Sequence, residues 1–166
     1  MATLTGGLRD RMVLESVLQD IKAQLTTLGW FDAGRDHSPI TIVDEYPGED
    51  GDVPINTLAF SLGDTMSDPL ELGSGAEELR IPIFCDFFAE SDGLGRHVVG
   101  DIHAHVAKQG QFDVLDYRVT PTPPVEFVVQ VNDGSIDKRK PTRAVNAWQK
   151  NWHVISFVVT EERSNA

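Results

Sequence analysis

The stretch from Arg80 to Val106, RIPIFCDFFAESDGLGRHVVGDIHAHV, gathers the side chains of this chain that could carry out chemistry. It holds the only cysteine and three of the five histidines. A cysteine near a histidine could act as a nucleophile, and histidines near carboxylates could bind zinc. Either site requires that the strands and helices of this stretch bring those side chains together.

The segment 92–109 is predicted to be an amphipathic helix. Its apolar residues fall on one face when they are spaced at 100° per residue; they are Leu94, Val98, Val99, Ile102 and Val106. Ser91 or Asp92 can cap the start of this helix, and Gly110 can end it. The apolar face identifies the side of the helix that packs on the core.

Three possible metal ligands, His97, Asp101 and His105, lie along one flank of this helix at intervals of four residues. His103 points almost the opposite way from His97 and cannot join them. His97 and His105 are about 12 Å apart along the helix axis at a rise of 1.5 Å per residue, so the three converge poorly on one ion. They remain weak metal candidates, and they would need help from another segment.

The segment 79–89 is predicted to be a central strand. Ile81, Ile83, Cys85 and Phe87 lie on one face, while Phe84 and Phe88 lie on the other with Asp86 between them. A strand that is apolar on both faces is usually packed on both. Cys85 is therefore expected to be a small core residue rather than a nucleophile. Asp86 is expected to lie at a solvated edge or to pair with a basic group.

The remaining elements follow from periodicity and turn residues. A helix is predicted over 8–28, where Leu14, Val17, Leu18, Ile21, Leu25 and Leu28 recur at spacings of three and four and Gly29 can end the helix. Strands are predicted at 40–43, 56–62, 112–119, 125–131 and 152–160. Loops are predicted at 44–52 and 64–78, the latter mobile, with a proline break at 121–124. A basic loop and a short helix-like piece at 141–151 precede the last strand.

Composition excludes several classes of protein. The 166 residues, 40% hydrophobic and 24% charged, fit one globular domain, predicted over 1–166 with 44–78 as a loop-rich acidic insertion. The apolar runs are shorter than the roughly 20 residues of a membrane helix, and the N-terminal residues lack the apolar core of a signal peptide. G-x-S-x-G, H-E-x-x-H and phosphate-loop patterns are absent, so neither an enzyme nor a cofactor is expected.

Charge is distributed unevenly along the chain. The net charge of −12 disfavours general binding to nucleic acid backbones. Residues 36–78 contain 11 acidic side chains without a lysine or arginine, whereas residues 138–150 contain five of the 14 basic ones. These segments are either two solvated loops or two faces of opposite sign. Opposite faces allow copies of one chain to pair head to tail, which produces a ring if the contact closes.

The order and texture of these segments resemble the tail terminator (minor tail or tail-completion) proteins of long-tailed bacteriophages. The resemblance covers most of the chain. It rests on the amphipathic N-terminal helix ending at GWFDAG, the acidic middle, and the strand IPIFCDFFAESDG leading into a helix with VVGDIHAHV. The proline break, VEFVVQV and the closing WQKNWHVISFVVTEE strand complete it.

This resemblance implies an α/β (α+β) fold, with a mixed or largely antiparallel sheet of about four or more strands and helices packed on one side. It also implies a ring, most often of six copies, on the last ring of the tail tube. Such a ring stops tube polymerisation and offers a surface to the head-side connector. The resemblance implies that the protein is located in the tail or neck of the virion, and in the host cytoplasm while the virion is assembled. DNA would only pass through the channel, and catalysis and a membrane partner are not expected.

Two groups of residues are assigned hypothetical roles in such a ring. Acidic residues of the 44–52 and 64–78 loops would line or rim the channel, where they would repel DNA phosphates and let DNA slide; the candidates are Asp44, Glu45, Glu49, Asp50 and Asp52. Basic residues would contact an acidic surface on a neighbouring copy or on the tail tube; the candidates are Lys138, Arg139, Lys140 and Arg143.

Other interpretations remain open at this point. A head–tail stopper or adaptor of the phage neck shares much of this texture. A small metal-dependent enzyme or ligand-binding module would use His97, Asp101, His105 and His37. A host α/β domain of another role is also compatible with the sequence.

Overall fold

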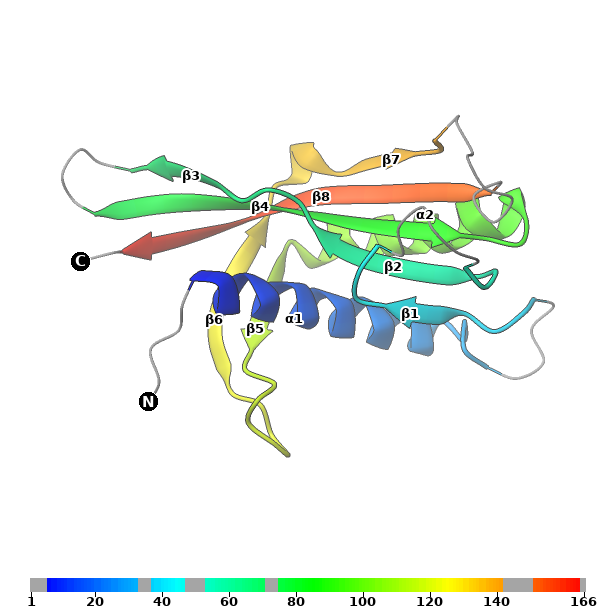
Figure 1. Ribbon diagram of the computed structural model, residues 1–166, viewed down its shortest axis with the longest axis horizontal. Coiled ribbons are helices and arrows are strands. Elements are labelled where there is room, and N and C mark those ends of the chain that lie inside the picture. The colour runs from blue at the N-terminus through cyan, green and yellow to red at the C-terminus, as the bar shows by residue number, and fades with distance from the viewer. Residues whose placement is uncertain (1–5, 33–36, 47–52, 71–74, 142–150, 165–166) are drawn as a thin grey trace.

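The computed structural model describes residues 6–32, 37–46, 53–70, 75–141 and 151–164. Within these ranges two α-helices pack on one face of an 8-stranded sheet (Figure 1). The sheet is mixed but mostly antiparallel, because among the described strands only β1 and β2 pair in parallel. The predicted α+β fold is confirmed.

Each helix is followed by a run of strands along the chain, α1 by β1 to β4 and α2 by β5 to β8. The helices are α1 (Gly6–Thr27) and α2 (Asp92–Gln109), and a short 3-10 turn, η1, covers Asp133–Ser135. The strands are β1 (Thr41–Val43), β2 (Thr57–Leu62), β3 (Met66–Pro69), β4 (Ala76–Phe88), β5 (Gln111–Leu115), β6 (Val125–Val131), β7 (Asp137–Arg139) and β8 (Trp152–Ser164).

Two long antiparallel strands, β4 and β8, form the middle of the sheet. The strand order is β1-β2-β4-β8-β6-β5, with β3 also paired to β4 and β7 also paired to β8. Pro82 fits inside β4 because the neighbouring strand changes there from β2 to β3. Its carbonyl accepts a hydrogen bond from the Gly63 N–H at 2.9 Å, and no strand carbonyl is needed opposite its nitrogen.

The hydrophobic core lies between the helices and one face of the sheet. On β4 this face carries Ile81, Ile83, Cys85 and Phe87, all fully buried, as their alternation predicts. On α2 it meets Val98, Val99, Ile102 and Val106, which are also buried. The predicted core faces of β4 and α2 are confirmed. Leu28 was predicted to belong to the apolar face of the N-terminal helix, but it lies beyond the end of α1 and is 38% exposed.

Local signals define the helix ends. The Ser91 side chain accepts a hydrogen bond from the Leu94 N–H, so Ser91 caps α2, and Gly110 ends α2 in the left-handed conformation. At the end of α1, Gly29 also has a positive φ, and the Trp30 N–H bonds to the Leu25 carbonyl. This six-to-one bond is the Schellman pattern, which satisfies a carbonyl at the helix end.

The structure corrects several predicted elements. The expected loop 64–78 contains β3 and the start of β4, which pair as an antiparallel hairpin. The expected basic loop contains β7, which pairs with the β8 residues Val154–Ser156. The predicted strand 112–119 ends at Leu115, whereas β8 continues beyond the predicted residue 160 to Ser164. Most of the helix-like piece at 141–151 lies outside the described residues.

Within the described residues, neither helix combines the length and the apolar character required to cross a membrane.

Candidate functional site

The histidine row of α2 is divided between two different contacts. Nε2 of His97 lies 3.7 Å from Oδ2 of Asp101, and that same oxygen accepts a hydrogen bond of 2.9 Å from the Trp30 indole. Nε2 of His105 lies 2.6 Å from Oδ2 of Asp20 on α1. His105 therefore links the two helices and does not join the other two candidates.

The described residues contain no group of three or more histidine, cysteine or acidic side chains arranged to hold a metal ion. His37 lies beside Trp30 with ring centroids 5.6 Å apart and the ring planes tilted by 39°, and its Nδ1 lies 2.8 Å from the Ser38 carbonyl oxygen. His97 meets the same indole edge-on at 4.7 Å. The described side chains thus give the metal interpretation no convergent ligand set.

Cys85 and Asp86 serve the interior of the sheet. Cys85 is completely buried, and burial raises the pKa of its thiol, which opposes the reactive thiolate. Asp86 is only 6% exposed, and it accepts a hydrogen bond of 2.8 Å from the Trp152 indole. Burial raises the pKa of Asp86, while the Trp152 hydrogen bond and the charge of Arg139 oppose the rise. Of the two expected settings for Asp86, the solvated edge was wrong, because the residue lies inside the central strand β4. The basic group of the other expectation is represented only by the charge of Arg139, and the hydrogen-bond partner is an indole.

Four basic side chains form what we call the basic surface: Arg96, Lys138, Arg139 and Lys140. They line a hollow of about 270 Å³ together with Val99 and His153. Arg96 comes from the first half of α2, and the other three come from β7 and the residue after it. The structure therefore brings together Lys138, Arg139 and Lys140, as their sequence proximity implies, and adds Arg96. The fourth predicted cation, Arg143, lies outside the described residues.

Asp92 organises one side of the basic surface. Its carboxylate accepts hydrogen bonds from Lys140 Nζ at 2.6 Å and from Arg96 Nε at 2.7 Å. These two bonds hold the pKa of Asp92 far below its ordinary value. Lys138 and Arg139 make no ion pair in the described part of the chain. The basic surface therefore carries four cations and one carboxylate. Lys138 and Arg139 are the two cations that Asp92 does not pair with, and they can bind a partner.

His153 forms the floor of this hollow. It is 4% exposed, and its Nε2 lies 3.2 Å from Oδ1 of Asp92 without the alignment of a hydrogen bond. Burial lowers the pKa of His153, with the Asp92 carboxylate opposing that effect. The ring packs against α2 at Gly95, where a side chain would collide with it. His153 is therefore a neutral packing residue beneath the cations at neutral pH.

Four acidic side chains form what we call the acidic surface: Asp10, Glu15, Asp44 and Glu45. They line a second hollow of about 260 Å³ between the first half of α1 and the residues after β1, together with Arg11. Asp10 already pairs with Arg163 at 3.2 Å. Glu15, Asp44 and Glu45 have no ion pair within the described ranges. Three further rim candidates, Glu49, Asp50 and Asp52, lie outside the described residues.

The two surfaces occupy opposite edges of the sheet. The acidic surface adjoins β1, and the basic surface includes β7 on the far side of β8 (Figure 1). Three strands, β2, β4 and β8, lie between them. At about 4.8 Å per strand, β1 and β7 are roughly 19 Å apart across the sheet. The two surfaces therefore cannot neutralise each other within one chain.

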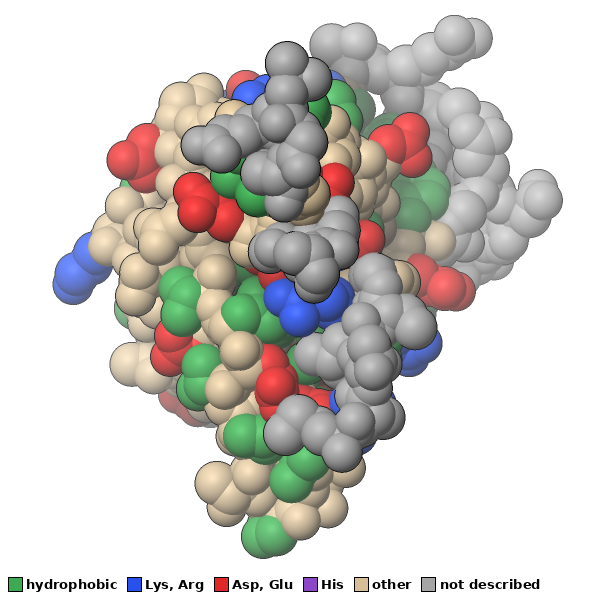
Figure 2. All heavy atoms as spheres, turned by 90° about the vertical axis from the view of Figure 1, so that its left-hand side faces the viewer, with side chains coloured by type: hydrophobic (Ala, Val, Ile, Leu, Met, Phe, Trp, Pro, Cys, Tyr) green, Lys and Arg blue, Asp and Glu red, His purple; other side chains and the backbone are tan. Residues whose placement is uncertain are grey.

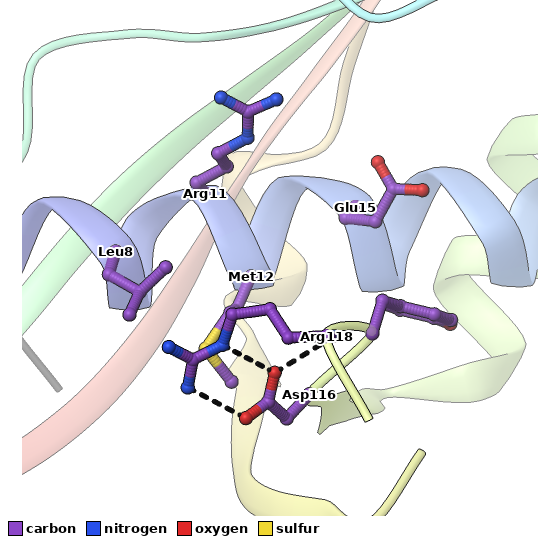
Figure 3. Close-up of a pocket in the computed structure, with 7 residues that line it drawn as sticks. Leu8, Arg11, Met12, Glu15, Asp116 and Arg118 are labelled. Carbon is purple, nitrogen blue, oxygen red and sulfur yellow. Dashed lines mark hydrogen bonds and ion pairs between the residues drawn. The ribbon is translucent and has the colours of Figure 1, made fainter. Parts of the chain in front are cut away.

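A third hollow, of about 240 Å³, lies between α1 and the loop after β5 (Figure 3). Its polar centre is the Asp116 carboxylate, which accepts 2.8 Å bonds from both Nε and an Nη of Arg118. These bonds lower the pKa of Asp116, which is therefore ionised and held by its own loop. Arg11 and Glu15 point away from this pair (Figure 3). The arrangement stabilises the loop and does not resemble a nucleophile beside a base.

The hairpin of β5 and β6 projects from the sheet and exposes apolar side chains. Val119, Val125 and Val128 are 46%, 54% and 39% exposed. Viewed from the left-hand side of Figure 1, the lower lobe that this hairpin forms is rich in apolar side chains (Figure 2). Above it, acidic and basic side chains are interspersed. This arm is a further candidate for contact with another protein.

No protein-family profile and no curated protein matches this chain. The candidate site is therefore defined by its own side chains. Sequence reasoning identified the basic segment at 138–140 and the acidic pair Asp44 and Glu45. It missed Arg96, Asp10 and Glu15, which join the two surfaces from distant helices. The spacing of Asp92 and Arg96, one helical turn apart, was the only local signal of such a pairing.

Proposed function

We propose that this protein is a structural component of a long-tailed phage, a tail terminator that forms a ring at the head-proximal end of the tail tube. The observation that carries the proposal is the presence of oppositely charged surfaces on opposite edges of one sheet. A contact between two different patches of identical subunits is heterologous, and such contacts build rings when the rotation closes. The confirmed α+β fold agrees with the fold that the resemblance implies.

The proposal assigns the work of the protein to binding. A terminator needs a contact with its own copies, another with the tail tube and another with the head-side connector. The two charged surfaces supply the first contact, and the apolar hairpin of β5 and β6 offers area for one of the others. Contiguous exposed apolar side chains often mark protein contact sites.

The acidic channel remains a prediction of this function. A net charge of −12 suits a ring that surrounds DNA without holding it, because carboxylates repel phosphates. The carboxylates that would line or rim this channel belong to the 44–52 and 64–78 segments.

Tube length measures this function directly. The purified chain is added to its cognate tail-tube protein during polymerisation, and length distributions are recorded over a range of molar ratios. Tubes that shorten and stop growing as the chain is added would support a terminator. Tubes of unchanged length, combined with binding to the head-side connector, would instead favour a stopper or adaptor.

A further inference from the structure

The two surfaces carry net charges of opposite sign. On the basic surface four cations face one carboxylate, Asp92. On the acidic surface four carboxylates face Arg11, and Asp10 also pairs with Arg163. Each surface therefore keeps unneutralised charge where its side chains are exposed. Unlike patches of this kind attract, accelerate encounter and fix the register of a contact.

We propose that the acidic surface of one copy docks on the basic surface of a second copy, with Lys138 and Arg139 opposite Asp44 and Glu45. The proposal rests on the ring function argued above and names the contact that builds the ring. All four of these side chains are exposed. In this arrangement Asp44 and Glu45 belong to the subunit contact rather than to the channel wall.

The edges of the sheet favour this pairing over a contact between two identical surfaces. A symmetric dimer through the basic surface would bring Lys138 and Arg139 of both copies together, and like charges repel. The same holds for Asp44 and Glu45 on the other edge. Because the two surfaces lie on opposite edges of the sheet, each copy binds one neighbour on either side. That geometry continues from copy to copy, as a ring requires.

Salt provides a first measure of the contact. Exposed charges are screened beyond about 8 Å at physiological ionic strength, so attraction between the surfaces weakens as salt is added. Salt should weaken the wild-type assembly, so that more protein is required to keep the copies assembled in 1 M NaCl than in low salt. The assembled fraction is measured by mass photometry or sedimentation velocity of the full chain.

Exchange of charge between the two surfaces tests the identity of the partner. One variant carries Lys138→Glu with Arg139→Glu, and the other carries Asp44→Lys with Glu45→Lys. Each variant alone places like charges at the contact and is expected to require at least about tenfold more protein for assembly, since reversed pairs repel. An equimolar mixture of the two is expected to assemble into rings again, because each reversed surface meets an oppositely reversed one.

Control variants change the net charge in the same direction at positions outside the two surfaces. Lys22→Glu and Asp113→Lys change exposed charges on α1 and β5 that belong to neither surface. These controls should assemble like the wild type. Circular dichroism and urea unfolding of every variant would show that a loss of assembly does not come from a loss of folding.

The outcomes separate this contact from the function on which it rests. Rings that form normally from both reversed variants would overturn the docking and leave the terminator role standing. Variants that fail alone and also fail as a mixture would overturn the second copy as partner. DNA binding that is lost with Lys138→Glu and Arg139→Glu, with assembly unchanged, would assign the basic surface to nucleic acid. A wild-type chain that neither forms rings nor caps tubes would overturn both proposals.

Discussion

Replacement of Gly95 by alanine tests how tightly α2 and β8 pack beneath the basic surface. A Cβ atom at residue 95 would lie 2.1 Å from Cδ2 and 2.5 Å from Nε2 of His153. The ring is buried, so it cannot swing freely into solvent. In a helix interior, alanine stabilises the folded state by about 1 kcal/mol relative to glycine. Overpacking of a core lowers the free energy of unfolding by roughly 1–3 kcal/mol. With so short a contact the upper value applies, and a net loss of about 2 kcal/mol is expected.

Gly100 provides the matched control on the same helix. A Cβ atom there would meet nothing within 4 Å, so Gly100→Ala is expected to stabilise the protein by about 0.5–1 kcal/mol. Urea unfolding gives both free energies, and Gly95→Ala should lower Tm by about 4–8 °C. Adding His153→Ala to Gly95→Ala should remove the collision and most of its cost. Equal stabilities of the two alanine variants would refute the packing of His153 against α2.

Three further outcomes follow from buried charges. Glu161 is 4% exposed and pairs with two arginines, so Glu161→Gln should lower the free energy of unfolding by about 3 kcal/mol. The neighbouring Glu162 is exposed, and Glu162→Gln should change that free energy by less than about 0.5 kcal/mol. Urea unfolding measures both. Burial lowers the pKa of His153, so the unfolded chain binds more protons than the folded one at mildly acidic pH. The free energy of unfolding should therefore fall as the pH drops below about 6.5. In His153→Gln this dependence of the free energy of unfolding on pH should be weaker. Burial raises the pKa of Asp86, so the ionised carboxylate destabilises the folded state. Asp86→Asn should therefore have a higher free energy of unfolding than the wild type at pH 7, and this difference should shrink toward pH 4. A difference that is as large at pH 4 as at pH 7 would contradict a raised pKa of Asp86.

Elements with strong apolar periodicity were predictable from the sequence. The core faces of β4 and α2 follow from alternation and from the helical repeat, and Ser91 and Gly110 mark the ends of α2. Strands β3 and β7 were not predictable, because they are short and their side chains are exposed. They are strands because they hydrogen-bond to β4 and β8, which local sequence does not reveal.

The candidate site was predictable only where its residues are neighbours in sequence. Lys138, Arg139 and Lys140 form a visible basic run, and they do lie together. The contribution of Arg96 depends on the packing of α2 beside β8. The indole partner of Asp86 likewise comes from a residue 66 positions away, Trp152. Such contacts are set by the register of β4 against β8, which no local pattern in either segment specifies.

Imaging of tail tubes with the bound chain would show whether this protein forms a ring at the tube end. The purified protein is mixed with its cognate tail-tube protein and examined by negative-stain electron microscopy, both in side view and end-on. We expect closed rings of this chain at one end of tubes that have stopped growing. Tubes with bare ends, beside a chain that remains monomeric at every protein and salt concentration tried, would contradict the terminator function.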